Sequence, residues 1–245
     1  MCFDAAASFA ASAILVPAGL YTLRVAWEAD RRWLPLAGFP LLFGVQQALE
    51  GLIWLALGDP LGRFVAAPPL ASVPLAALGF LGFAYVLWPT LVPLAARSVE
   101  PRPRRRLLFA ILAALGAADG LFIYLPLLLH PDWLDVGILG GSILYEPKVL
   151  FATALSQPVG RALYALVVLL PLLLSSQSLV RRFGLLILIS VVLSAVAYGY
   201  AFVSVWCFFA ALLSAWLGVR LPEHLARVER DGDRMATETR VLGRG

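Results

Sequence analysis

Residues that build metal, haem and disulfide sites are scarce in this chain. It has two cysteines and two histidines among 245 residues. In the topology derived below, His130 and His224 fall on opposite sides of a membrane. Zinc and haem sites need such ligands close together, and two cysteines make no disulfide framework. We therefore expect no metal or other cofactor.

Charged residues, and lysine above all, are also rare. Charged residues make up 14% of the chain, against about 25% in soluble domains. Hydrophobic residues make up 61%, which indicates an integral membrane protein. Lys148 is the only lysine and lies in a predicted loop, so a retinal Schiff base on a buried lysine is not expected.

Seven apolar runs are long enough to cross a bilayer, which takes about 20 residues. They are approximately residues 5–27, 34–57, 70–95, 107–129, 159–175, 183–198 and 201–219. We divide the last two at Tyr198-Gly199-Tyr200, because one helix over both would be about 55 Å long, and the hydrocarbon core is about 30 Å thick. Prolines inside the spans predict kinked helices.

These runs predict an all-α fold. We expect a kinked bundle of seven transmembrane helices over residues 1–222, followed by a polar tail over residues 223–245 that frays after about one turn. Arginine follows every odd-numbered span, which places the N-terminus outside and the C-terminus in the cytoplasm of a bacterial inner membrane. The arginines that define this pattern are Arg24, Arg31 and Arg32, then Arg97, Arg102, Arg104, Arg105 and Arg106, then Arg181 and Arg182, and finally Arg220, Arg227, Arg230 and Arg234.

The connection over residues 130–158 is longer than the others and lies on the outer side. Its residues 136–145 carry no charge, and so short an apolar run favours an interfacial or re-entrant segment over a span. Loops of this length often serve as lids or binding loops. A plain surface cap is the alternative interpretation.

The second span carries the most informative polar residues. Gln46, Gln47 and Glu50 stand in an otherwise apolar run, and Gln46, Glu50 and Trp54 share one helix face. A carboxylate inside a membrane costs about 2.5–3.5 kcal/mol on insertion scales and by default marks a functional site. We interpret Glu50 as a proton-handling or ligand-binding group. The alternative is a neutral or amide-paired glutamate that holds helices together.

The fourth span carries a second intramembrane carboxylate, Asp119. It stands between Gly116 and Gly120, whose spacing predicts close contact with another helix. By rise per residue Asp119 lies at mid-depth, slightly deeper than Glu50. It is therefore a candidate to share one cavity with Glu50, an expectation that depends on the rotation of the helix.

Five stretches are distinctive: the opening Met-Cys-Phe-Asp-Ala-Ala-Ala-Ser-Phe, residues 43–51, Trp88-Pro89, residues 142–146 and residues 201–209. In these stretches the chain resembles an uncharacterised bacterial family of multi-pass membrane proteins whose members typically begin Met-Cys-Phe-Ser. The resemblance covers nearly the whole chain and implies a fold, but no activity. This chain departs from it at Asp4, where serine is usual, and at Gly141, where the resemblance implies histidine.

On the predicted topology most of this resemblance falls in the outer half of the bundle, at residues 2–8, Glu50, residues 142–146 and residues 201–207. We therefore expect a cavity open to the outer face, lined by Asp4, Gln46, Glu50 and Tyr145, with Glu146 at its rim.

Three functions remain open on this evidence. The first is a binding or transport module for a small polar or cationic ligand, or for protons, that uses Glu50 with Asp119. The second is an accessory subunit that docks a protein partner through its small-residue faces. The third is a membrane enzyme acting on lipids through carboxylates, which is the least supported. The arginines mark topology rather than nucleic-acid binding, the bilayer is the expected surrounding, and the oligomeric state stays open.

Overall fold

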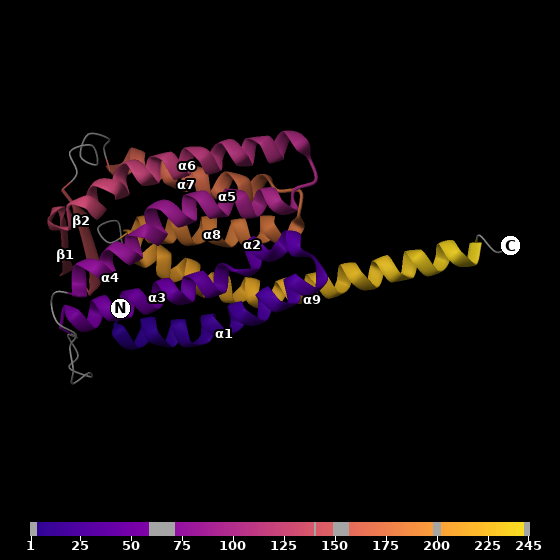
Figure 1. Cartoon of the computed structure of the whole chain (residues 1–245), viewed down its shortest axis with the longest axis horizontal. Coiled ribbons are helices and arrows are strands. Elements are labelled where there is room, and N and C mark those ends of the chain that lie inside the picture. Colours follow the sequence, from indigo (N-terminus) through magenta and orange to yellow (C-terminus); the bar gives the residue numbers. More distant parts are fainter. Residues whose placement is uncertain (1–3, 59–71, 140, 149–156, 198–201, 243–245) are drawn as a thin grey trace.

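The computed structural model describes residues 4–58, 72–139, 141–148, 157–197 and 202–242. Over these residues the chain is mostly helical. Seven helical passes run back and forth, and a two-stranded hairpin lies at the end of the bundle that holds the start of α1 (Figure 1). The helical bundle expected from the apolar runs is thus confirmed in outline.

Several passes are built from more than one element. In chain order the elements are α1 (Ala5–Ala29), η1 (Arg31–Trp33), α2 (Leu34–Ala37), α3 (Phe39–Ala56), α4 (Ser72–Leu81), η2 (Gly82–Leu87), α5 (Trp88–Val99), α6 (Pro103–Leu129), η3 (Pro131–Trp133), β1 (Leu134–Leu139), β2 (Ser142–Pro147), α7 (Gln157–Leu174), α8 (Ser178–Ala197) and α9 (Phe202–Leu242). Among the described residues, six passes are long and apolar enough to cross a membrane. The seventh, α7, has a shorter apolar stretch, Ala162–Leu174.

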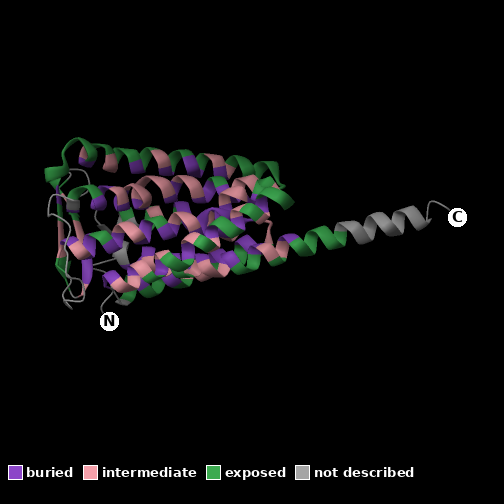
Figure 2. Cartoon of the chain, turned by 60° about the horizontal axis from the view of Figure 1, so that its bottom comes forward, coloured by how far each residue is buried: buried purple, intermediate pink, exposed green. Residues whose placement is uncertain are grey.

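The outer surface of the bundle is apolar. On α6 the exposed side chains include Ile111, Leu115, Phe122 and Leu125, and Figure 2 shows exposed and half-buried residues along its length. Water-soluble proteins rarely expose contiguous apolar patches of this kind. Together with the six long apolar passes, this surface identifies a multi-pass membrane protein.

Prolines set the breaks in the second and third passes. Pro40 lies in the first turn of α3 and Pro89 in the first turn of α5, where a missing N–H costs little. Just before Pro89 the backbone widens into the π-helix η2, in which the Trp88 N–H bonds to the Phe83 carbonyl. The hydroxyl of Tyr164 on α7 donates to the Ala84 carbonyl at 2.7 Å, so a neighbouring helix satisfies the irregular backbone.

Two glycines bring α6 against the kinked third pass. A Cβ atom at Gly120 would stand 2.0 Å from the Tyr85 carbonyl oxygen, and one at Gly116 would stand 2.3 Å from the Pro89 carbonyl oxygen. No larger side chain fits at either position. The predicted close contact at Gly116 and Gly120 is therefore confirmed, and it determines which face of α6 points inward.

A hairpin takes the place of the re-entrant segment that was one expectation over residues 136–145. Strands β1 and β2 pair antiparallel, with Val136 opposite Tyr145, and Gly141 at the turn has φ +75°. The re-entrant interpretation was wrong because apolar and β-branched residues flank a glycine pair here, a pattern typical of a hairpin, and an interfacial position stays a prediction. β1 contacts α4 and β2 contacts α9, so the hairpin closes one end of the bundle.

The C-terminal region also differs from expectation. α8 and α9 are separate helices packed side by side, as predicted, and the turn at Tyr198-Gly199-Tyr200 lies outside the described residues. The tail, however, does not fray after one turn. α9 continues without interruption to Leu242 and extends well past the bundle (Figure 1), since the tail's many charged residues are compatible with a solvated helix.

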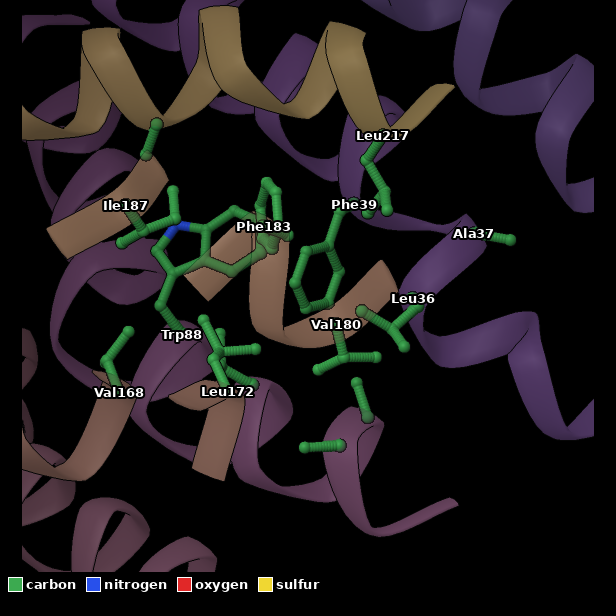
Figure 3. Close-up of a cluster of buried hydrophobic side chains, with 14 of the residues drawn as sticks. Leu36, Ala37, Phe39, Trp88, Val168, Leu172, Val180, Phe183, Ile187 and Leu217 are labelled. Atoms are coloured by element: carbon green, nitrogen blue, oxygen red, sulfur yellow. The ribbon is translucent and has the colours of Figure 1, made fainter. Parts of the chain in front are cut away.

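Large side chains from several passes form the core at the middle of the bundle (Figure 3). Trp88 lies at its centre, with the Phe43 ring stacked on it at 3.8 Å and the Phe39 ring edge-on at 5.5 Å. Phe183 of α8 packs against Phe39. This packing holds the Trp88 indole in one position, where its N–H reaches the polar residues of α3.

Candidate functional site at the hairpin end

The polar residues of α3 are buried together in the half of the bundle nearest the hairpin. Gln46 and Gln47 have no exposed surface and Glu50 is 2% exposed. The helical period of 3.6 places residues three and four apart on neighbouring positions of one face. In this arrangement the side-chain amide of Gln47 donates to a carboxylate oxygen of Glu50 at 3.0 Å.

Gln46 is fully used in joining helices. Its carbonyl oxygen accepts from the indole N–H of Trp88 on α5 at 2.8 Å. Its amide nitrogen contacts the sulfur of Cys207 on α9 at 3.5 Å. Gln46 therefore links three passes beside Glu50, and both its side-chain oxygen and its nitrogen already have a partner. Trp88 and Cys207, its two partners, were not singled out with Gln46 from the sequence.

The hairpin contributes Tyr145 to the same region. The Tyr145 ring stacks on Phe80 of α4, with centroids 5.1 Å apart. The residue as a whole is half-buried, but its hydroxyl oxygen is buried and has no hydrogen-bond partner among the described residues. Burial raises the pKa of Tyr145 well above its usual value, and the nearby Glu50, Cys207 and Tyr85 raise it further. Tyr145 is thus a neutral hydroxyl within electrostatic range of Glu50.

Other buried polar atoms at this end also have no partner within the described ranges. They are Ser8 Oγ, Gln47 Oε1, Trp54 Nε1 and Ser142 Oγ. Trp54 follows Glu50 by one helical turn on the same face, and Ser142 lies on the strand that carries Tyr145. We call Gln47, Glu50, Trp54 and Tyr145 the Glu50 cluster. More than nine-tenths of buried polar groups in proteins are hydrogen-bonded, so this concentration of unpartnered atoms sets the cluster apart from an ordinary protein core.

Asp4 serves the start of α1. Its carboxylate accepts from the Ala7 N–H at 2.8 Å and caps the helix. Serine caps helices equally well, which explains how aspartate can stand where the resemblance implies serine. A Cβ at Gly51 would meet the Phe9 ring, and this register places Asp4 level with Ala56, about 9 Å along the bundle from Glu50 by the rise per residue.

The expectation that Asp119 faces the bundle interior was wrong. Asp119 is exposed on the outer side of α6. Gly116 and Gly120 occupy the contact with the third pass, and a rotation of about 100° per residue turns the neighbouring Asp119 away from it. The two intramembrane carboxylates therefore do not share a cavity.

The remaining predicted residue, Glu146, is exposed on β2. Alternation along a strand turns it away from Tyr145. The cavity expected to open outward is closed over the described residues, because Gln46, Gln47 and Glu50 have almost no exposed surface. A cavity of about 30 Å³ lies deeper and is lined by aromatic and aliphatic groups, Trp88 and Trp206 among them, and by Cys207.

The comparisons with known proteins identify a family without an assigned activity. A family of unknown function, DUF6629, matches residues 1–230. The chain belongs to DUF6629. Neither a curated protein nor a solved structure matches it. The resemblance to an uncharacterised family is confirmed at this level, and what a DUF6629 protein does has to be inferred from the geometry.

A second buried carboxylate, Glu100, was missed by the sequence analysis. It is 3% exposed and lies at the opposite end of the bundle, just after α5. It accepts from the Ser176 N–H at 2.7 Å, from the Ser176 hydroxyl at 2.6 Å and from the Arg102 N–H at 3.2 Å. Burial works against ionisation, but these bonds and the charge of Arg105 hold the pKa of Glu100 below its usual value. No local pattern could have shown this, since Ser176 lies in another connection.

Proposed function

We propose that this DUF6629 protein is a binding or transport module whose Glu50 cluster takes up a small polar or cationic ligand, or protons. The observation that carries the proposal is a buried carboxylate with unused polar atoms beside it, Gln47 Oε1 and the Tyr145 hydroxyl. Burying polar groups without partners costs roughly 1–3 kcal/mol each by mutational data. A bound ligand or water that used these atoms would remove that cost.

The proposal includes the topology. Seven spans with the N-terminus outside place the hairpin and the Glu50 cluster in the outer half of a bacterial inner membrane. The support is the distribution of arginine, which favours the cytoplasmic side of short connections. Reporter fusions after Leu242 test it: a reporter active only in the cytoplasm should work there, and one active only outside should not. The reverse result would place the cluster on the cytoplasmic side.

The test of the site compares two carboxylates in one membrane domain. Thermal unfolding of detergent-purified wild type and of Glu50→Gln is measured from pH 4 to 9, with Asp119→Asn as the matched control on the exposed face of α6. Two other titratable groups interact electrostatically with Glu50, namely Tyr145 of β2 and Cys207 of α9. Neither a phenol nor a thiol ordinarily titrates at acid or neutral pH.

We expect wild type and Asp119→Asn to show the same transition in unfolding temperature with pH, and Glu50→Gln to lack it. Identical curves for all three proteins would mean that Glu50 does not exchange protons in the folded state. If a panel of small polar ligands then also acted equally on all three, the binding function would be rejected and Glu50 would be a helix-joining residue.

One observation favours the accessory-subunit alternative. α9 extends past the bundle as a helix to Leu242 (Figure 1), and such a helical extension offers a surface to another protein. Stable co-purification of one protein with the full chain, lost when residues 232–245 are removed, would favour this function. Unchanged recovery of the chain by itself would reject it.

A further inference from the structure

Asp119 is a carboxyl group on the membrane-facing surface of the bundle. Its side chain is exposed on α6 and makes no hydrogen bond or ion pair with any described residue. The apolar part of α6 runs from Leu107 to Leu129 and is centred on Ala118, the residue next to Asp119. Lipid tails offer no hydrogen bonds, so an ionisable side chain at this depth is costly unless another group meets it.

The chain's own helices leave this face of α6 open. α6 lies at the edge of the bundle (Figure 1) and packs against the third pass and α7. Leu115 and Phe122, about one turn before and after Asp119, are both 57% exposed. Ionisable residues inside membranes almost always face a protein interior or a water-filled cavity and pair with another group. We therefore expect a second polypeptide to cover this face.

A second copy of the same chain fits this face. Two copies inserted in the same direction are related by an axis along the membrane normal, so each residue meets groups at its own depth. Among the described residues, the other exposed acidic and basic side chains lie near one end of the bundle or the other. The charged or acidic group that a second copy presents at the depth of Asp119 is therefore its own Asp119.

We propose that two copies of this chain pack together along α6, with their Asp119 side chains paired near a two-fold axis in the middle of the membrane. A charge is costly there, whereas a neutral carboxylic acid has both an O–H donor and an acceptor oxygen. Two such acids are complementary to each other and can bond reciprocally. Leu115, Phe122 and Ile111, which is 48% exposed, would pack around the pair. This interface does not depend on the Glu50 cluster.

The first test measures the oligomeric state of the detergent-purified full chain by size-exclusion chromatography with light scattering, over a series of dilutions. We expect a dimer for wild type. Asp119→Leu keeps an apolar side chain and removes the hydrogen bonds, so its dimer should dissociate at a concentration about tenfold higher. Asp119→Asn has a donor and an acceptor in its amide and should stay as dimeric as wild type.

The second test traps the interface by disulfide formation in membranes, before detergent is added. Leu115→Cys on α6 should give a cross-linked dimer on mild oxidation, because a disulfide requires Cα atoms within about 7 Å. The matched control is Ile189→Cys on α8, which is 56% exposed in the middle of its pass and should not cross-link. Wild type, with Cys2 and Cys207, gives the background.

Several results would overturn the dimer. They are a monomeric wild type at every dilution with no cross-link at Leu115→Cys, an Asp119→Leu variant as dimeric as wild type, and a cross-link at Ile189→Cys in place of Leu115→Cys. Stoichiometric recovery of a different protein, lost in Asp119→Leu, would also reject the second copy in favour of a foreign partner. Should Asp119→Leu not fold, the cross-links decide. No outcome involves Glu50, so the proposed function is tested separately.

Discussion

Glu50 and Glu100 are both buried carboxylates, 2% and 3% exposed, at opposite ends of the same bundle. Glu100 receives hydrogen bonds from its own connection and from the one between α7 and α8. Its partner Ser176 is in turn bonded by Arg105 at 3.3 Å. Around Glu50, by contrast, polar atoms of Gln47, Trp54 and Tyr145 have no partner in the described part of the chain.

The contrast separates a structural carboxylate from a candidate site. Glu100 ties two connections together, as does the Gln177 side chain, which donates to the Val99 carbonyl at 3.0 Å. A fully satisfied buried network makes a structure rigid and unique, whereas a partly satisfied one is costly. The unpartnered atoms of Gln47, Trp54 and Tyr145 are therefore where a ligand has the most to contribute. Burial of the carboxylate alone does not distinguish the two ends.

The largest expected effect is the loss of Glu100. Glu100→Ala leaves the Ser176 and Arg102 donors without their acceptor, which should cost about 3 kcal/mol and lower the thermal unfolding temperature by about 6–12 °C. The matched control is Glu146→Ala, which removes an exposed carboxylate and should change it little. Equal unfolding temperatures for both variants would contradict a structural role for Glu100.

Acidification should reveal the contribution of the Glu100 carboxylate to the stability of the fold. Because the pKa of Glu100 is lowered in the folded protein, its contribution to stability is present above its ordinary value of 4.5 and is lost as the pH falls through the folded value. Wild type should therefore lose stability on acidification over that range, and Glu100→Gln should lose less. Parallel acid curves for the two proteins would show that Glu100 has the same pKa folded and unfolded.

The apolar runs and the spacing of four between Gln46, Glu50 and Trp54 were sufficient to predict the passes and the polar face of α3. The rotation of α6 was not predictable, because it depends on the match of Gly116 and Gly120 to the kinked backbone at Pro89 and Tyr85. Asp119 was misplaced for that reason.

Two further features, the buried carboxylate of Glu100 and the hairpin of β1 and β2, could not be predicted from the apolar runs alone. Glu100 meets Ser176, which is 76 residues away in the chain, and nothing in the arginine-rich stretch around Glu100 predicts such a pairing. The hairpin was predictable, since alternation around a glycine pair favours a β-turn. The short apolar run over residues 136–145 pointed instead to an interfacial or re-entrant segment. The pairing of Gln46 with Trp88 and Cys207 again required the packed helices.

A smaller effect should come from loss of the hydrogen bond that Gln46 accepts from the Trp88 indole. Trp88→Phe removes the indole N–H at 2.8 Å and leaves the Gln46 oxygen buried without a donor, at a cost of about 1–3 kcal/mol. A double-mutant cycle with Gln46→Leu isolates this pair. The double variant should lose less stability than the sum of the two single losses. Additive losses would mean that the bond contributes nothing beyond packing.

The smallest expected effect compares one serine hydroxyl from each end. Ser176 Oγ donates to Glu100 and accepts from Arg105, so Ser176→Ala should cost about 1 kcal/mol or more. Ser142 Oγ is buried and has no partner among the described residues, so Ser142→Ala should change the free energy of unfolding by less than about 0.5 kcal/mol. Both are measured by thermal unfolding in the same detergent without added ligand. A loss at Ser142 as large as that at Ser176 would show that the hairpin end is already satisfied in the isolated protein, and the difference between the two carboxylates would disappear.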